Sequence, residues 1–273
     1  KGFKYNHFDF IITNPPFGSI IRQTEKAYLK EYKLGKKEED WLAVKQPPET
    51  VRENQSTEIL FIEQCYNFIK EGGYLAIVIP DGILTNSSLQ YVRDHIEEIF
   101  RIVAVVSMPQ TAFSANGAGV KSSVLFLKKY AETETQQIRN LKKNSKHSLL
   151  SAHQYKKRVM QLENEKKQAI STLEKQYKEK YPSLDKKGLA PLMAEEKKEI
   201  QDEFSGKVNN LKEELQDAFL TEKQKKLKDY PIFMAIAEEI GYDATGKKTA
   251  VNELEVIGEE LELFIKAIKN GEI

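Results

Sequence analysis

The sequence predicts an α/β fold with a largely parallel sheet, followed by a long helical region. Three apolar runs, 8–13, 74–79 and 102–106, show no polar alternation, which is typical of strands buried on both faces. Segments with helical spacing separate these runs, and a strand–helix–strand order favours a parallel sheet. From about residue 131 to 230 Lys, Glu and Gln dominate, which indicates a separate helical region.

The first half of the chain predicts alternating strands and helices. The strand 8–13 ends at Asn14-Pro15-Pro16, because prolines lack a donor and fix φ. Residues 19–57 predict an irregular excursion with one helix near 25–32. Ser56 or Thr57 is placed to cap a helix that runs to about residue 70 and stops at Gly72. The further expected elements are the strand 74–79, a helix over 88–100, and the strands 102–106 and 122–127.

The second half predicts a helical hairpin. Apolar residues recur at helical spacing from about 149 to 228, with breakers at Pro182, Gly188 and Pro191. Two long amphipathic helices are therefore expected to pack antiparallel as a coiled coil, with their dense charges on solvated faces. Residues 231–241 suit a helix or a strand from pattern alone. A turn at 243–246 and a helix from about 252 to 269 follow.

Charge and composition exclude several classes of protein. The net charge is +1 over 273 residues, so any DNA surface must be local or supplied by a partner. The single cysteine, Cys65, lies in an apolar helical pattern and predicts a core residue in a reducing, cytoplasmic setting. The four histidines lack metal-ligand spacing, so no metal site is expected. No apolar run approaches the roughly 18–20 residues that span a bilayer, so no membrane contact is expected.

The motif Asn14-Pro15-Pro16-Phe17 follows the first buried strand and carries the chemistry. An exocyclic amine on a base is a poor nucleophile because its lone pair is delocalised into the ring. The Asn14 side-chain carbonyl and the Pro15 backbone carbonyl can accept hydrogen bonds from such an amine, and the prolines stiffen the loop. Phe17 offers a flat face for an extruded base. A plain turn is the alternative, but delivery to the carboxyl edge of a parallel sheet favours a ligand site.

Residues 9–18, Asp-Phe-Ile-Ile-Thr-Asn-Pro-Pro-Phe-Gly, resemble the catalytic motif of adenine-N6 DNA methyltransferases. The resemblance is to the C-terminal part of the catalytic domain in the modification subunit of type I restriction-modification systems. It covers about half of the chain, in the order 58–63, 72–84, 106–128 and 233–254.

The resemblance implies a partial Rossmann-like, S-adenosylmethionine-dependent methyltransferase sheet. In the family, the strand that resembles 122–128 is followed by its antiparallel partner, which resembles 232–240. Residues 131–230 would then be an insertion at the tip of a β-hairpin. The expected domains are 1–130, the C-terminal part of the methyltransferase domain; 131–230, the helical hairpin; and 231–273, the closing strand and helix.

The resemblance also implies S-adenosylmethionine as methyl donor and adenine N6 in double-stranded DNA as target. In the family, the glycine-rich turn and the acidic residue that hold the donor precede the motif, and neither is present here. Gly72-Gly73 follows a helix, and Gly117 and Gly119 precede a strand, which is the wrong context for a donor turn. The early start of the strand 8–13 adds to the expectation of a fragment that is inactive alone, with an incomplete donor site and unassigned cofactor-binding residues.

Further contacts are expected around the motif. Asp81, Phe113 and Lys121 are candidate substrate-binding residues. A turn role suits Asp81 equally and a core role suits Phe113 equally, and solvation is the simpler account of Lys121. Basic residues of the excursion could contact phosphates nonspecifically: Arg22, Lys26, Lys30, Lys33, Lys36 and Lys37. The resemblance implies a specificity subunit and a restriction subunit as partners, with the specificity subunit reading the DNA sequence.

Two other readings stay open. Similar Asn-Pro-Pro-aromatic motifs serve enzymes that act on guanine N2 in RNA or on glutamine in protein, although Phe17 and the downstream segments favour DNA adenine. The third reading is a non-catalytic assembly module whose helical hairpin docks on partner subunits.

Overall fold

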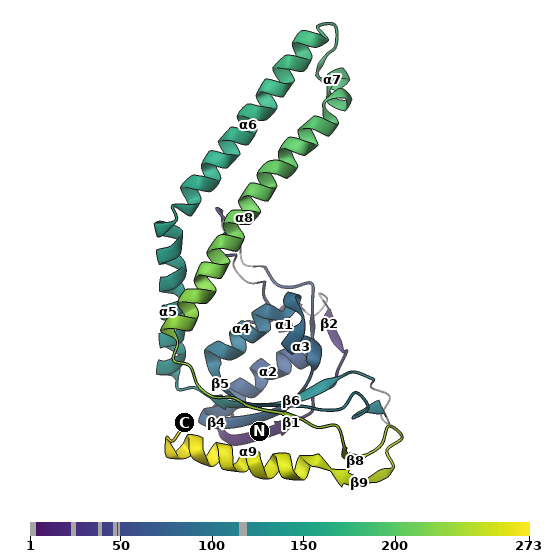
Figure 1. Ribbon diagram of the computed structural model, residues 1–273, viewed down its shortest axis with the longest axis vertical. Helices are drawn as coiled ribbons and strands as arrows, with labels where there is room; N and C mark the ends of the chain where they lie inside the picture. Colours follow the sequence, from purple (N-terminus) through teal and green to yellow (C-terminus); the bar gives the residue numbers. More distant parts are fainter. Residues whose placement is uncertain (1–3, 23–25, 38–39, 46–47, 49, 115–118) are drawn as a thin grey trace. The chain divides into compact units, whose positions relative to one another are not determined.

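The computed structural model describes residues 4–22, 26–37, 40–45, 48, 50–114 and 119–273 (Figure 1). The chain divides into two compact units, which we name the sheet unit and the helical unit. The sheet unit comprises Lys1–Glu39, Pro47–Arg139 and Asp229–Ile273, and the helical unit comprises Asp40–Gln46 and Asn140–Lys228. The expected domain limits at residues 130 and 230 stay predictions.

The sheet unit is built on a five-stranded mixed sheet. Its strands lie in the order β1 (Phe8–Thr13), β4 (Ile69–Pro80), β6 (Ser122–Lys129), β5 (Phe100–Ser107) and β7 (Phe233–Ile236). β1 is parallel to β4 and β5 is parallel to β7, whereas β6 runs antiparallel to both of its neighbours. The α/β class is confirmed, and so is a largely parallel sheet, because β1, β4, β5 and β7 all run in the same direction and β6 alone is reversed. The three apolar runs that predicted parallel strands, 8–13, 74–79 and 102–106, lie in β1, β4 and β5.

The prediction that 232–240 pairs antiparallel with 122–128 is wrong. Residues 232–240 contain β7 and the first residue of β8 (Ile240–Tyr242). β7 pairs in parallel with β5. β6 already has β4 on one side and β5 on the other, so neither of its edges is available to β7. The helical insertion therefore does not lie at the tip of a β-hairpin. β8 pairs instead with β9 (Lys248–Asn252), across the turn predicted at 243–246.

Helices cover both faces of this sheet (Figure 1). α2 (Thr57–Phe68) and α4 (Gln90–Ile99) lie on one face, and α9 (Glu253–Asn270) lies along the other. The helices predicted at 88–100 and 252–269 are confirmed as α4 and α9. The shorter elements are α1 (Lys26–Leu29), α3 (Asp81–Thr85), the 3-10 helix Ser87–Leu89, and the strand pair β2 (Ile20–Arg22) and β3 (Asn54–Ser56).

The main core lies between the sheet and the helices α2 and α4. Ile77 and Leu125 from the strands meet Ile62 from α2 and Ile96 from α4, and all four are buried. Each such side chain stabilises the fold by about 1.5–3 kcal/mol. Cys65 of α2 packs in the same cluster, as predicted, and burial raises the pKa of its thiol to about 11.

Gly72 and Gly73 do not stop a helix, contrary to the expectation. α2 ends at Phe68 and β4 begins at the next residue, so both glycines lie within β4. Gly72 has a φ of +74°. A Cβ on Gly73 would lie 2.9 Å from the Asp9 carbonyl oxygen and 2.6 Å from Cγ2 of Ile69. The pair therefore lets the backbone of β1 approach β4 closely, at the point where the register between these strands shifts.

The helical unit consists mainly of α6 (Tyr155–Lys180), α7 (Lys186–Leu192) and α8 (Ala194–Lys226), preceded by α5 (Glu132–Ala152), which begins in the sheet unit. Tyr155 at the start of α6 clusters with Leu215 near the end of α8, whereas Leu173 clusters with Met193 beside the start of α8. α6 and α8 therefore run antiparallel, as the apolar spacing predicts, and coiled-coil winding stays a prediction. Among the described residues no helix is long and apolar enough to cross a membrane.

The helical unit also takes in a segment from far upstream. Trp41, Leu42 and Val44 belong to its larger apolar cluster. The Tyr155 hydroxyl donates to the Leu42 carbonyl oxygen over 2.8 Å, and the rings of Trp41 and Phe219 lie 5.7 Å apart. Part of the excursion that follows the Asn-Pro-Pro-Phe motif is therefore core of the helical unit.

Candidate active site

The segments that carry the predicted site residues leave the sheet at one edge. Thr13, the last residue of β1, pairs with Ile77 of β4. Pro80 at the end of β4 pairs with Ser122 at the start of β6, and Ser123 pairs with Ser107 at the end of β5. The loop after β1, the start of α3 and the loop between β5 and β6 therefore meet at this edge, and they hold the predicted residues 14–17, 81, 113 and 121.

The motif itself is partly open to solvent. Asn14 and Pro16 are exposed, Phe17 is half-buried and Pro15 is buried. The pairing of β1 with β4 fixes the chain up to Thr13, so the motif begins from a rigid strand end. The side-chain carbonyl of Asn14 is accessible to a ligand at the edge of the sheet.

Thr57, the first residue of α2, holds the chain just after Asn14. Its hydroxyl donates to the Pro16 carbonyl oxygen over 3.0 Å and lies 3.3 Å from the Ser19 carbonyl oxygen, to which its backbone N–H donates over 3.0 Å. The expected side-chain cap of α2 is wrong, because Ser56 makes no cap hydrogen bond and the Thr57 hydroxyl is engaged by the motif loop. This contact between distant segments has no signal in the sequence.

Two of the predicted site residues meet directly. The rings of Phe17 and Phe113 lie 6.3 Å apart at an interplanar angle of 87°, an edge-to-face pair. They come from the loop after β1 and the loop after β5. The two phenylalanines therefore form an apolar pair at the sheet edge from which Asn14 also emerges.

Asp81 and Lys121 lie at the same edge, where both side chains bind protein groups. The Asp81 carboxylate accepts a hydrogen bond from the Ser123 hydroxyl over 2.7 Å, and its backbone N–H donates to the Lys121 carbonyl oxygen over 2.9 Å. The Lys121 ammonium donates to the Met108 carbonyl oxygen. These bonds join the start of α3 to the loop between β5 and β6. The substrate-binding roles of Asp81 and Lys121 stay predictions.

The excursion after the motif is held by two buried polar side chains, Glu63 of α2 and Gln55 of β3. The Glu63 carboxylate accepts the backbone N–H groups of Lys33, over 2.7 Å, and Leu34, over 2.9 Å. The Gln55 amide donates to the Leu34 carbonyl oxygen and to the Tyr91 hydroxyl. The predicted phosphate contacts of its basic residues stay predictions, and the side chains of Arg22 and Lys26 lie outside the described part of the chain, as does Gly117.

A glycine-rich turn of the kind expected to hold the methyl donor is not found among the described residues, and the expected incompleteness of the donor site stays a prediction. Gly18 and Gly82 are single glycines in the segments after β1 and β4, and no described turn combines several glycines with a preceding strand and a following helix. β1 is also the last strand on its side of the described sheet, so no described strand places an acidic residue beside the motif from that side. Within these same residues no three His, Cys, Asp or Glu side chains are grouped to hold a metal ion.

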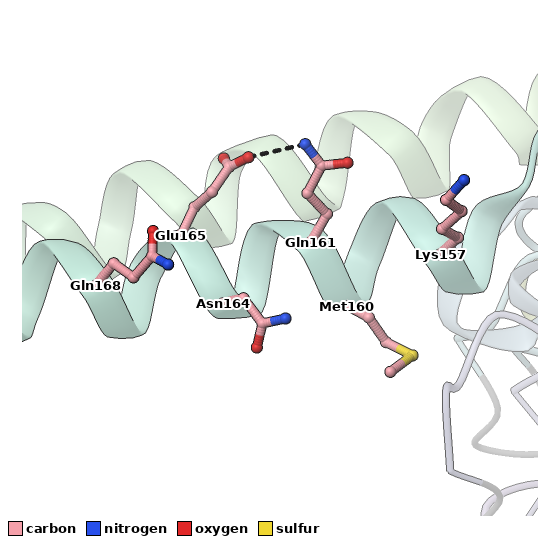
Figure 2. A pocket seen from close by; sticks show the side chains of 6 residues that line it. All are labelled: Lys157, Met160, Gln161, Asn164, Glu165 and Gln168. Carbon is pink, nitrogen blue, oxygen red and sulfur yellow. Dashed lines mark hydrogen bonds between the residues drawn. The ribbon is translucent and has the colours of Figure 1, made fainter.

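A hollow of about 560 Å³ lies on the helical unit, along one face of α6 (Figure 2). Its lining side chains all come from this helix at spacings of three or four residues, and Gln161 donates to the Glu165 carboxylate over 3.0 Å. The lining residues are Lys157, Met160, Gln161, Asn164, Glu165 and Gln168. An open face of one helix does not converge groups on a reacting atom, so the candidate active site remains the edge of the sheet.

The mixed α/β sheet and the Asn-Pro-Pro-Phe loop at its edge define a protein of the methyltransferase type. The family comparison makes this specific. Residues 1–225 match the family described as N-6 DNA Methylase, and the chain belongs to this family.

Individual relatives are more distant and much longer. The chain is 21% identical over 133 residues to the defense against restriction protein B of Escherichia phage P1, which covers 48% of this chain and 5% of that protein. A structure described as a class I S-adenosylmethionine-dependent methyltransferase from Listeria monocytogenes is 23% identical, with a TM-score of 0.36, over 48% of this chain and 35% of that one. One described as the modification subunit of a type I restriction enzyme from Vibrio vulnificus is 22% identical, with a TM-score of 0.32, over 45% and 23%.

Proposed function

We propose that this chain forms the target-base side of an enzyme that transfers a methyl group from S-adenosylmethionine to adenine N6 in double-stranded DNA, within a type I restriction-modification system. One observation carries the proposal. In a member of the N-6 DNA methylase family, Asn14-Pro15-Pro16-Phe17 lies at the edge of the sheet where the loops after β1, β4 and β5 meet.

The residues of the motif have distinct parts in this reaction. The Asn14 side-chain carbonyl and the Pro15 backbone carbonyl accept hydrogen bonds from the adenine amine, so electron density stays on N6. Two prolines limit the motion of both acceptors, so little orientational entropy is lost when the amine binds. Phe17 stacks on the extruded base and offsets part of the few kcal/mol that extrusion from the duplex costs.

We infer that part of the methyl-donor site lies on polypeptide that covers β1. Phe8, Phe10 and Ile12 alternate along β1, so they lie on one face, where they are 37, 47 and 77% exposed. β1 is also an end strand of the described sheet, and an end strand with an exposed apolar face is normally covered. Protein that covers this edge would lie beside Asn14 and complete the donor site. When bound, the donor supplies an electrophilic methyl group.

We propose that the helical unit of this chain contacts the partner subunits, namely the specificity and restriction subunits. Met160, Leu192 and Leu220 are 56, 46 and 50% exposed on its helices. Exposed apolar side chains on long helices suit contacts with other helices. DNA sequence would be read by the specificity subunit, since no described element of this chain offers an array of base-reading side chains.

Product analysis tests the proposed reaction. The complete enzyme is incubated with S-adenosylmethionine labelled in its methyl group and with duplex DNA, RNA or protein as acceptor, and the labelled product is hydrolysed. We expect N6-methyladenine from DNA. Label in N2-methylguanine or in methylglutamine would overturn the substrate class, and donor binding without any transfer would favour an assembly module.

Calorimetric titration of S-adenosylmethionine into this chain tests the proposed division of the site. We expect no heat of binding from the chain alone, and binding once it is combined with a polypeptide that carries the glycine-rich part. Tight binding by the chain alone would contradict the division, because the described loops would then hold the donor.

A further inference from the structure

We propose that Thr57 is a positioning residue that fixes the Asn-Pro-Pro-Phe loop for catalysis, an inference that rests on the proposed function only for its effect on methyl transfer. Thr57 lies 40 positions after Phe17 in the chain, and the irregular excursion separates the two. It is the first residue of α2, where a helix has backbone N–H groups without partners inside the helix.

The hydrogen bonds of the loop converge on this one residue. Apart from the ladder between β1 and β4, the hydrogen bonds that the described part of the chain makes to residues 14–19 all come from Thr57. Its hydroxyl donates to the Pro16 carbonyl oxygen over 3.0 Å, and its backbone N–H donates to the Ser19 carbonyl oxygen over 3.0 Å. The hydroxyl is also 3.5 Å from the Glu58 carboxylate, which is too long for a strong bond.

The two prolines give this contact its importance. Pro15 and Pro16 have no N–H, so at these two positions the backbone can be hydrogen-bonded only through its carbonyl groups. Gly18, with a φ of +75° and no atom within 4 Å of an added Cβ, gives the loop no packing support beyond Phe17. Donors from outside the loop can bind these carbonyl groups, and Thr57 supplies two such donors.

The contact bears on the position of the stacking ring. Phe17 lies between Pro16 and Ser19, whose carbonyl groups Thr57 holds, so its backbone is restrained from both sides. Its ring meets Phe113 edge-to-face. Without the hydroxyl, the Pro16 end is released while the Ser19 end keeps its backbone bond. Both Phe17 and the adjoining Pro15 carbonyl would then lose their fixed position.

Amide exchange in the chain itself tests the contact. The N–H of residue 57 is bonded to the Ser19 carbonyl oxygen, so its exchange reports whether the loop stays in place. In Thr57→Val, which keeps the shape and removes the hydroxyl, we expect its protection to fall about five- to tenfold, the change that follows from one hydrogen bond of ordinary strength. Thr57→Ser retains the hydroxyl and should stay close to the unmodified chain.

Thr221→Val is the matched control. The Thr221 hydroxyl also donates to a backbone carbonyl oxygen, that of Asp217, over 3.0 Å, but within α8 of the helical unit. It should leave the exchange of residue 57 unchanged. Equal protection of residue 57 in Thr57→Val and in the unmodified chain would overturn the contact.

Kinetics of the complete enzyme test the catalytic consequence. Thr57→Val should lower kcat about tenfold with KM for DNA and donor unchanged, and Thr57→Ser should restore kcat, as for the loss of a group that orients the reacting atoms. Unchanged kcat in Thr57→Val would overturn the positioning role. If exchange responds as expected while even the unmodified enzyme fails to methylate DNA, Thr57 holds the loop and it is the proposed function that fails.

Discussion

The sheet unit and the helical unit are stabilised in different ways. In the sheet unit, one continuous core joins strands and helices from across the first half of the chain, with Ile77, Ile62 and Ile96 all but inaccessible. The helical unit has two small clusters, one around Tyr155 and Leu215 and one around Leu173, and the surfaces between them are largely charged. A defect should therefore spread through the sheet unit but stay local in the helical unit.

The largest expected loss of stability comes from truncating one buried leucine to alanine in each unit. Leu127 of β6 and Leu215 of α8 are both fully buried. Leu127→Ala should destabilise the sheet unit by about 2–5 kcal/mol, toward the upper end, because the neighbouring strands cannot collapse into the cavity. Leu215→Ala should cost less, because helices packed through a small cluster can shift. Chemical denaturation followed by circular dichroism and by Trp41 fluorescence measures the two values.

The same two variants test whether the sheet unit and the helical unit unfold separately. Leu127→Ala should leave the transition reported by Trp41 in place, since Trp41 belongs to the cluster of the helical unit. Leu215→Ala should move that transition selectively. Equal shifts of both transitions in both variants would show that the two units unfold as one.

Alkaline pH should destabilise the sheet unit because the Cys65 thiol ionises more readily in the unfolded chain. Burial raises the pKa of Cys65 to about 11 from a usual value of 9.0. The contribution of the neutral thiol is complete below pH 9 and is lost as pH rises toward 11, because the unfolded chain ionises first. Between pH 8 and 11 the unmodified chain should lose about 2–3 kcal/mol more than Cys65→Ala, whose cavity cost does not depend on pH.

This pH effect is expected only in the sheet unit, because the chain has one cysteine and it lies there. Tyrosines that ionise in the same range are common to both variants, so the difference isolates the thiol. Parallel pH profiles for Cys65→Ala and the unmodified chain would mean that Cys65 is accessible to water.

A smaller effect is expected where the upstream segment joins the helical unit. Tyr155→Phe removes the donor to the Leu42 carbonyl oxygen and leaves that buried acceptor without this partner, at a cost of about 1–2 kcal/mol. Trp41, the only tryptophan, packs on Phe219, so its emission should shift to the red as the segment loosens. Tyr181→Phe in the other cluster is the control, and an equal shift there would contradict the assignment.

The elements set by local pattern were predictable from the sequence. The apolar runs predict β1, β4 and β5, and the helical spacing predicts α4, α9 and the antiparallel packing of α6 and α8. The motif 14–17 was predicted to follow a strand at the sheet edge, and the structure brings Asp81, Phe113 and Lys121 to that edge. Each of these expectations depends on periodicity or on the end of a single strand.

What could not be predicted depends on pairing between distant segments. The direction of β6 and the neighbour of β7 follow from which strand edges are occupied, and a run of apolar residues carries no such information. The sequence pattern predicts a helix stop at Gly73, because it does not show that the Asp9 backbone packs against this glycine. The pattern predicts a helix cap at Thr57 and a loop at Trp41. Their actual partners, Pro16 and Phe219, lie far away in the sequence.

Asn14→Ala in the complete enzyme tests the central claim most directly, namely that this edge holds the target amine. Methyl transfer to adenine should fall by about a hundredfold or more, the cost of removing one preorganised polar group from a reacting centre. Affinity for DNA and for S-adenosylmethionine should stay unchanged, because Asn14 contacts only the amine. If binding and rate fall together, or if the rate survives, Asn14 does not orient the target base and the assignment of the site is wrong.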